Sequence, residues 1–365
     1  MRVAIVHYWL VSMRGGEKML ECLLEMFPDA DIYTHVYSKK NVSASINRHR
    51  VYTSSVNRLP FASKLYRLYM PLMPRALLEF DLQGYELVIS SEAGPAKGVV
   101  AGPDAFHVCY CHSPMRYIWD LYHEYSRGAS IFLRFFMKML VPSLRVWDIT
   151  SANLVDRFIT NSSYTAKRIK RYYGRDADVV FGPADVERYE AVGRDVKDYY
   201  LVLGQIAENK RIDIAVDACL ALGRKLVVAG GGPVKALRRR VAAGGGVTFT
   251  GRVSDGEAAR LLSGARALLF PGIEDMGLVP VEAAAAGCPV IAYRKGGVLD
   301  TVKENVTGIF FDEQSAAALA AAIQHFETTE SLFTDRAAFS AHVRQFSKAA
   351  FKERVWKLLA ELKRI

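Results

Sequence analysis

One stretch, residues 266–297, constrains the fold of this chain more than any other. Its pattern predicts a short buried strand at residues 268–270, a loop, a helix that ends at Gly287, and a second apolar strand at residues 289–293. A strand, a helix and a strand in this order form one parallel βαβ unit. Such a unit requires an α/β domain, in which ligands bind in the loops at the carboxyl ends of the strands.

The loop of this unit carries two glutamates, Glu274 before the helix and Glu282, which we expect in its first turn. Backbone N–H groups near Gly277 and Leu278 can hold an anion or sugar hydroxyls at the helix N-terminus. Carboxylates accept hydrogen bonds from hydroxyl groups, so the loop suits a sugar and a ribose. Two arbitrary glutamates would more often only face solvent or complement the helix dipole, and the surrounding pattern is what favours a site.

That pattern resembles the signature of the retaining glycosyltransferases of family 4, which have the GT-B fold. The family usually has Glu-Gly-Phe-Gly-Leu-Pro-x-x-Glu-Ala, and this chain has Glu-Asp-Met-Gly-Leu-Val-Pro-Val-Glu-Ala from Glu274. Met276 replaces the usual aromatic residue and the proline falls one place later, at Pro280. This variant resembles the subgroup of mannosyltransferases that build O-antigen and exopolysaccharide.

The resemblance covers nearly all 365 residues, and it implies an α/β protein of two Rossmann-like, doubly wound parallel-sheet domains that face a central cleft. The length fits two domains of ordinary size. We expect an acceptor-binding domain at residues 1–185 and a donor-binding domain at residues 197–346. A basic amphipathic helix at residues 347–365 is expected to return to the first domain.

In the first domain, Gly15 and Gly16 separate a predicted strand at residues 3–6 from a predicted helix at residues 17–26. Paired glycines let the backbone approach a phosphate or a sugar ring closely. The resemblance places these glycines where donor and acceptor meet. It also places His112, after a strand at 106–111, beside the transferred sugar, where it would donate a hydrogen bond and is no obvious general base.

In the second domain, the family has an arginine directly after Gly204 and a lysine five positions further on. This chain has Gln205 and Lys210 there. The resemblance implies that Lys210 neutralises the leaving diphosphate, that Gln205 offers only neutral hydrogen bonds, and that Arg211 is a candidate replacement for the arginine. The complete donor-binding set implied by the resemblance is Gly15, Gly16, Gln205, Lys210, Arg211, Arg252, Val253, Glu274, Met276, Gly277, Leu278 and Glu282, with His112, Glu274 and Lys210 as the catalytic residues.

The net charge of +10 is unevenly distributed, because residues 32–78 contain eight Lys or Arg and no Asp or Glu. Cations interleaved with aromatic and aliphatic residues favour an anionic membrane or a pyrophosphate-lipid surface, with a solvated basic face as the alternative. No nucleic-acid-binding motif accompanies the charge. The candidate acceptor or membrane-surface residues are Arg58, Lys64, Arg67, Arg75 and Arg116. The apolar segment 130–147, which includes Arg134, Lys138 and Arg145, is either a core helix or a helix that lies against a membrane.

The implied reaction is transfer of a hexose from a nucleoside-diphosphate sugar to a lipid-linked glycan, with retention of the anomeric configuration. GDP-mannose is the first choice of donor, ahead of UDP-glucose, UDP-galactose and a rhamnose donor, and no metal or cofactor is expected. With no apolar run of about 18 residues, no signal peptide and five scattered cysteines, we expect a cytoplasmic protein bound peripherally to the inner face of the membrane. A sugar-nucleotide epimerase and a non-catalytic nucleotide-binding subunit remain alternatives, the latter because of Gln205 and Met276.

Overall fold

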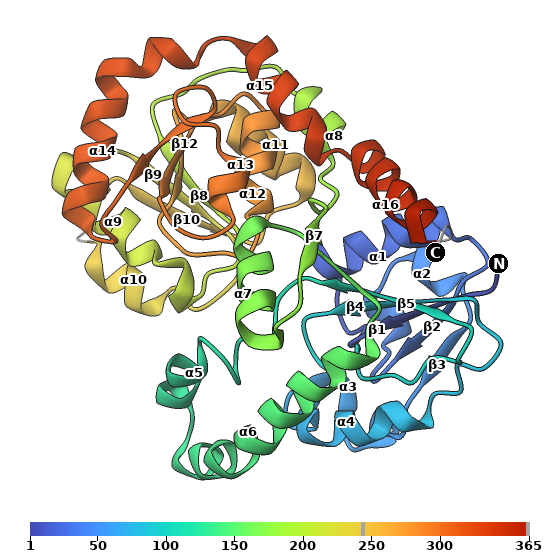
Figure 1. The fold of residues 1–365 in the computed structure, drawn as a ribbon. Helices are drawn as coiled ribbons and strands as arrows, with labels where there is room; N and C mark the ends of the chain where they lie inside the picture. Colours follow the sequence, from blue (N-terminus) through green and yellow to red (C-terminus); the bar gives the residue numbers. More distant parts are fainter. Residues whose placement is uncertain (242–244, 363–365) are drawn as a thin grey trace. The chain divides into compact units, whose positions relative to one another are not determined.

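The computed structural model describes residues 1–241 and 245–362, and the chain divides into two compact units, Met1–Val180 (unit 1) and Phe181–Ile365 (unit 2). Each unit contains one parallel sheet with helices packed around it (Figure 1). The predicted fold class, α/β with two Rossmann-like parallel sheets, is therefore confirmed.

The sheet of unit 1 has seven parallel strands in the order β3-β2-β1-β4-β5-β6-β7. The strands are β1 (Val3–His7), β2 (Asp31–Thr34), β3 (Val51–Thr53), β4 (Leu87–Glu92), β5 (Phe106–Cys111), β6 (Arg157–Thr160) and β7 (Ala177–Val179). Because β1 pairs with β2 on one side and with β4 on the other, the strand order reverses there. The carboxyl ends of β1 and β4 thus form the switch point at which α/β sheets bind ligands.

The helices of unit 1 connect these strands as crossovers and surface turns. They are α1 (Gly15–Met26), α2 (Ala44–Asn47), α3 (Ala62–Leu65), α4 (Met73–Ala76), α5 (Tyr122–Gly128), α6 (Ile131–Ser151) and α7 (Ser163–Tyr173), with short 3₁₀ turns between several of them. β1 and β4 are buried along their whole length, as expected for central parallel strands covered on both faces.

Gly15 and Gly16 are the first two residues of α1, whereas the sequence placed them in a loop before the helix. The helix starts early because the backbone N–H of Arg14 donates to the Glu17 carboxylate in a capping box. Only glycine fits at position 16, since a Cβ there would lie 2.3 Å from the Tyr8 hydroxyl. Gly16 therefore allows α1 to pack closely against Tyr8, the residue that follows β1.

A buried ionic network joins α6 to the end of β4. Lys97 Nζ donates to Glu92 Oε1 at 2.8 Å and also bonds Asp148, and all three side chains are fully buried. Trp119 Nε1 and the Tyr173 hydroxyl donate to the other Asp148 oxygen at 2.7 and 3.0 Å. Burial opposes the charge on Lys97, but Asp148 and Glu92 raise its pKa above the usual range. The network fixes α6 to the carboxyl end of the central strand β4.

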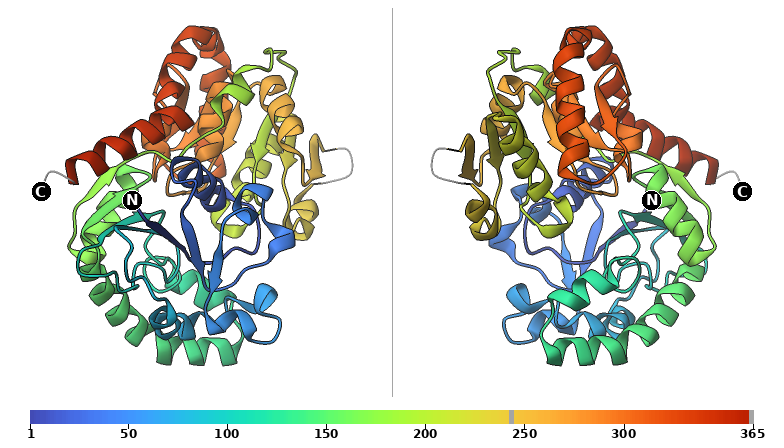
Figure 2. Two further views of the ribbon diagram at one scale, coloured as in Figure 1. Left: turned by 90° about the vertical axis from the view of Figure 1, so that its right-hand side faces the viewer. Right: turned by 90° about the vertical axis from the view of Figure 1, so that its left-hand side faces the viewer.

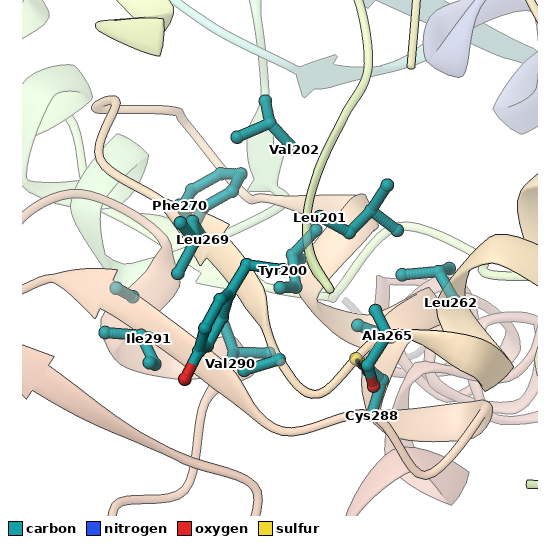
Figure 3. Close-up of a cluster of buried hydrophobic side chains, with 14 of the residues drawn as sticks. Tyr200, Leu201, Val202, Leu262, Ala265, Leu269, Phe270, Cys288, Val290 and Ile291 are labelled. Carbon is teal, nitrogen blue, oxygen red and sulfur yellow. Dashed lines mark hydrogen bonds between the residues drawn. The ribbon is translucent and has the colours of Figure 1, made fainter. Parts of the chain in front are cut away.

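The sheet of unit 2 has six parallel strands in the order β10-β9-β8-β11-β12-β13, with its reversal between β8 and β11. The strands are β8 (Tyr200–Leu203), β9 (Leu226–Ala229), β10 (Val247–Gly251), β11 (Leu268–Phe270), β12 (Val290–Tyr293) and β13 (Gly308–Phe311). The helices are α8 (Val186–Glu190), α9 (Ile212–Leu222), α10 (Lys235–Arg240), α11 (Asp255–Gly264), α12 (Leu278–Ala285), α13 (Val298–Thr301), α14 (Ala316–Thr329), α15 (Arg336–Val343) and α16 (Lys348–Leu362). The central strands are wholly apolar and pack into one core (Figure 3).

The two compact units divide between Val180 and Phe181, a few residues before the expected end of the first domain at residue 185, and the expected domain bounds stay a prediction. Residues 181–190 join unit 2 because Phe181 packs on Phe346, with ring centroids 4.8 Å apart, and Ala184 bridges to Ser347. The C-terminal helix α16 is also grouped with unit 2, where Arg354 lies over the Phe181 ring. Its expected return to the first domain stays a prediction.

The buried network predicts a large stability loss for Lys97→Met, because the buried carboxylates of Glu92 and Asp148 would lose the cation that they share. We expect the free energy of unfolding to fall by about 3–5 kcal/mol. Urea unfolding followed by circular dichroism measures it. Lys64→Met is the matched control, since Lys64 is exposed, and it should change stability by less than about 0.5 kcal/mol. Equal effects of the two substitutions would contradict a structural role for the network.

Candidate active site

A lysine and a glutamate meet at the switch point of unit 2. Lys210 ends the 3₁₀ turn Glu208–Lys210 in the loop after β8, and Glu274 lies in the loop after β11. Their Nζ and Oε1 atoms are in direct contact, and both side chains keep roughly a quarter of their surface exposed (26% and 21%). The structure thus brings together two of the three residues predicted to be catalytic, which lie 64 positions apart in the sequence, with both side chains partly exposed.

Glycines hold the backbone of this site in place. A Cβ on Gly272 would lie 2.8 Å from the Cα of Lys210, so glycine lets the two loops touch. The N–H of Gly297 donates to the carbonyl of Glu274 at 2.8 Å, and a Cβ on Gly297 would lie 2.0 Å from the Asp275 carbonyl oxygen. The loop of Glu274 is therefore clamped between the Lys210 loop and the turn after β12.

The second glutamate of the motif, Glu282, lies one helical turn deeper than predicted. The helix α12 starts at Leu278, directly after Gly277, which is left-handed with φ of 79°. Glu282 therefore sits in the second turn, where it is partly buried beside Tyr189 of α8. Burial and this carboxylate, which accepts a hydrogen bond from the hydroxyl, raise the pKa of Tyr189. Sequence reasoning missed Tyr189, because nothing local links α8 to α12.

Met276, the departure from the family's aromatic residue, is buried. Its sulfur accepts a hydrogen bond from the N–H of Gly182 at 3.3 Å. Leu278 is only partly buried at the start of α12. Met276 therefore acts on the loop from inside, by fixing it to the segment that begins unit 2, rather than through an exposed face.

The remaining predicted donor residues of unit 2 follow other strands of the same sheet. Gln205 is exposed directly after β8, and Arg252 and Val253 follow β10, with Arg252 exposed. Arg211 is left-handed at φ of 49°, and its guanidinium makes two bonds of 3.2 Å to the Asp213 carboxylate. This pairing turns Arg211 toward its own helix, which weakens the case that it replaces the missing arginine at position 205.

In unit 1, three side chains line up across the carboxyl ends of β1, β4 and β5. Ser91 Oγ lies 2.9 Å from His7 Nδ1 and 3.0 Å from His112 Nε2. The backbone of His112 is held on both sides, since its N–H donates to the Glu92 carbonyl at 2.8 Å and its carbonyl accepts from Asn161 Nδ2 at 3.1 Å. His112 is partly buried, whereas His7 and Ser91 are fully buried, so His112 is the member placed to meet a ligand.

Burial shifts the pKa values of His7 and Glu17 toward the uncharged forms of both side chains. Burial, assisted by nearby His112, lowers the pKa of His7 well below its usual value of 6.5. Burial also raises the pKa of Glu17, whose Oε1 lies 4.0 Å from His7 Nε2. A neutral His7 can exchange one hydrogen bond with Ser91, which leaves the serine hydroxyl one further bond to direct at His112. Sequence reasoning did not identify Ser91 or His7 as partners of His112.

The basic residues assigned to an acceptor or membrane surface separate into two kinds. Arg58, Lys64, Arg67 and Arg75 are all exposed on unit 1. Arg116 is partly buried after β5, where its Nε lies 3.4 Å from Ser113 Oγ. Arg116 therefore lies on the same sheet edge as His112 rather than within the exposed basic stretch. In the described residues, no cluster of three or more His, Cys, Asp or Glu could hold a metal ion.

Two Rossmann-like parallel-sheet units in one chain are the architecture of the GT-B fold. The structure is similar to that of HepE from Anabaena solved with UDP, with a TM-score of 0.71 over 99% of this chain and all of that chain, at 16% identity. Residues 13–188 match the family model described as Glycosyltransferase Family 4, and residues 185–346 match the model described as Glycosyl transferases group 1. The chain belongs to the family 4, group 1 glycosyltransferases.

Two curated relatives are mannosyltransferases. The chain is 31% identical over 192 residues to a GDP-mannose-dependent alpha-(1-6)-phosphatidylinositol monomannoside mannosyltransferase of Mycobacterium tuberculosis, covering 44% of this chain and 50% of that protein. It is 27% identical over 266 residues to the human alpha-1,3/1,6-mannosyltransferase ALG2, covering 62% and 64%. The matched region thus spans between half and two thirds of these relatives.

The tight packing at Gly297 yields a test of the unit 2 site. Because its φ is an ordinary −68°, Gly297→Ala would be unfavourable only through the 2.0 Å approach to Asp275. The Glu274 loop must shift, and we expect affinity for nucleoside diphosphates to fall at least about tenfold, or about 1.4 kcal/mol. Titration calorimetry measures it. Gly256→Ala is the control, because a Cβ there meets nothing within 4 Å, and this variant should bind nucleoside diphosphates with wild-type affinity. Wild-type affinity in Gly297→Ala would contradict a nucleotide site at the Glu274 loop.

Proposed function

We propose that this protein is a retaining glycosyltransferase that moves mannose from GDP-mannose onto a lipid-linked glycan, at the inner face of the membrane where bacterial surface polysaccharide is made. Unit 2 binds the nucleotide sugar and unit 1 binds the acceptor. The relatives named above support a mannosyl donor, since both carry out mannosyl transfer by name. The exposed cations of residues 32–78 support an anionic, pyrophosphate-bearing acceptor.

The observation that carries this proposal is the contact between Lys210 and Glu274. In a nucleoside-diphosphate sugar, an anionic diphosphate is joined directly to a polyhydroxylated ring. A site for it needs a cation beside the phosphates and a hydrogen-bond acceptor beside the hydroxyls, at adjacent positions. Lys210 and Glu274 provide this pair, and their contact holds both side chains ready until the donor separates them.

The proposed reaction needs no protein nucleophile. The bond from the anomeric carbon to the leaving diphosphate breaks, the bond to the acceptor oxygen forms on the same face, and the acceptor proton passes to a diphosphate oxygen. The sugar gains positive charge while the diphosphate gains negative charge. Lys210 stabilises the leaving diphosphate, and Glu274 binds the ring hydroxyls through the same step. Glu282, oriented by Tyr189, binds the ribose.

We assign His112 of unit 1 to the same reaction as a hydrogen-bond donor to the transferred sugar, and Ser91 as the residue that positions it. The serine hydroxyl bonds His112 Nε2 directly, and His7 holds that hydroxyl from the other side. Ser91 is fully buried, so it acts through His112 and does not itself contact the substrate.

Substitution of the unit 2 pair tests the proposal. Lys210→Met removes the charge that meets the leaving diphosphate, and we expect kcat/KM for mannosyl transfer to fall about 10²-fold, or about 3 kcal/mol. Radiolabelled mannose transfer from GDP-mannose to polyprenyl-pyrophosphate oligosaccharide measures it. Lys225→Met is the control, because Lys225 forms an exposed pair with Asp198 away from the switch point. Equal transfer by wild type and Lys210→Met would refute the assignment.

A thermal-shift series separates the donor from the chemistry. GDP-mannose should raise the melting temperature of the wild-type protein by several degrees more than UDP-glucose, UDP-galactose or a dTDP-sugar. A larger shift with UDP-sugars would show that the donor is not GDP-mannose, and the proposal of a retaining glycosyltransferase would still stand. Binding without any transfer, or conversion of the donor without an acceptor, would instead favour a nucleotide-binding subunit or an epimerase.

The serine bridge gives a further prediction. Ser91→Ala should lower kcat about tenfold with little change in the KM for the donor, because His112 loses one hydrogen bond while unit 2 is untouched. Ser90→Ala is a close control: Ser90 is equally buried on the same strand, but its hydroxyl bonds His107 Nε2 at 2.8 Å. If both variants lost the same activity, the effect would be one of folding and not of His112.

A further inference from the structure

The helix α6 of unit 1 exposes an unusual amount of apolar surface. Ile131 and Phe132 are 78% and 76% exposed, and Phe135, Phe136 and Met139 are each more than half exposed. Among the residues that α6 buries are Val141, at the middle of the helix, and Asp148, in its second half. Soluble proteins rarely expose a contiguous apolar patch of this kind unless another surface covers it. The sequence left open whether this segment belongs to the core, and the first ten residues of the helix do not.

A second element with the same chemistry borders α6. The segment 61–78 exposes Phe61 (73%), Leu68 and Leu72 beside the cations Lys64 and Arg67. Figures 1 and 2 both show α3 and α4 along the same side of unit 1 as α6. The two elements also share a packing contact, because Trp147 of α6 and Leu77 both lie against Gly98. Together they form what we call the α6 face, residues 61–78 and 131–149.

The positive charge of the α6 face indicates which kind of surface can cover it. Its exposed ionisable groups are cations, Arg134 and Lys138 on α6 and Lys64, Arg67 and Arg75 on the neighbouring segment. The acid of α6, Asp148, is buried against Lys97 and adds no negative charge to the surface. Two copies of this face would bring like charges together, whereas an anionic phospholipid surface offers opposite charge and an apolar interior.

The depth of binding is limited. In the part of the chain that the structure describes, no helix is both long enough and apolar enough to cross a membrane. An amphipathic surface of aromatic side chains and cations lies instead in the interface, with its rings below the headgroups and its charges among the phosphates. Lys97 and Asp148 join α6 to the end of β4, the strand that carries Ser91. A helix bound to a bilayer at α6 is therefore connected through the buried ion pair to this strand.

We propose that the α6 face docks unit 1 on an anionic phospholipid bilayer, with Phe132, Phe135 and Phe136 inserted between the headgroups. This deepens the proposed function, on which it rests for its purpose, because a bilayer is where a lipid-linked acceptor resides. It adds to the basic stretch at residues 32–78 a second element, α6, that supplies the apolar contact.

Flotation with vesicles tests the proposal on the full chain. Vesicles of phosphatidylcholine with phosphatidylglycerol should bind the wild-type protein, and vesicles of phosphatidylcholine alone should bind it much less. The triple variant Phe132→Ser, Phe135→Ser, Phe136→Ser should lower binding at least about tenfold, because it removes most of the inserted apolar surface. The control is Val196→Ser, Leu299→Ser, Leu332→Ser, which changes three exposed apolar residues of unit 2 and should bind as the wild type does.

The outcomes are separable. Equal vesicle binding by the triple variant and the wild type would overturn the proposal, as would a wild-type dimer in light scattering that becomes monomeric in the triple variant while vesicle binding stays unchanged. Nucleotide-sugar thermal shifts on the same samples report folding and donor binding. A triple variant that keeps the shift but loses the vesicles supports docking by α6. A wild-type protein that binds vesicles but shifts with no nucleotide sugar would refute the proposed function and leave the docking face standing.

Discussion

The contact between Lys210 and Glu274 is the interaction on which the unit 2 site depends. An ammonium and a carboxylate at about a quarter exposure lose part of their hydration, and their attraction offsets this loss only when the two backbones approach closely. Gly272 and Gly297 permit that approach, since any Cβ there would collide with a neighbouring loop. The glycines are therefore as much part of the site as the charged groups, and the sheet reversal between β8 and β11 is what brings both loops to one place.

The switch point of unit 1 is built from hydrogen-bonding groups rather than from a partly exposed ion pair. Its switch point is deeper, so His7, Glu17 and Ser91 are buried, and burial shifts the pKa of His7 and of Glu17 toward their uncharged forms. Buried charges near this cluster are paired, as in Lys97 between Glu92 and Asp148. A neutral hydrogen-bonding cluster suits a residue that binds sugar hydroxyls, whereas the charged pair of unit 2 suits a leaving diphosphate.

The sequence predicted the elements that are defined locally. The strands at Leu268–Phe270 and Phe106–Cys111 are apolar runs bounded by turn residues, and both were placed correctly. Glu274 and Lys210 were predicted from the spacing of a family motif, which can be recognised without knowledge of packing, and the structure places their side chains in contact. The bond from Ser91 to His7 was missed, since it joins residues 84 positions apart whose strands are neighbours only in the sheet. Glu282 was placed one turn too early because the left-handed Gly277 starts its helix sooner than the apolar pattern shows.

The fate of α6 shows why periodicity alone leaves function undecided. The apolar residues of a helix indicate that another apolar surface covers them, but the sequence does not show whether that surface is the protein core, a second protein or a membrane. The structure shows that residues 131–140 do not belong to the core, because Met137 is the one residue among them that is partly buried. Exposed phenylalanines cost solubility and stability unless they are covered, so their partner lies outside this unit. The exposed ionisable groups within residues 61–78 and 131–149 are cations; they disfavour a second copy of this face, and an anionic bilayer offers both an apolar interior and opposite charge.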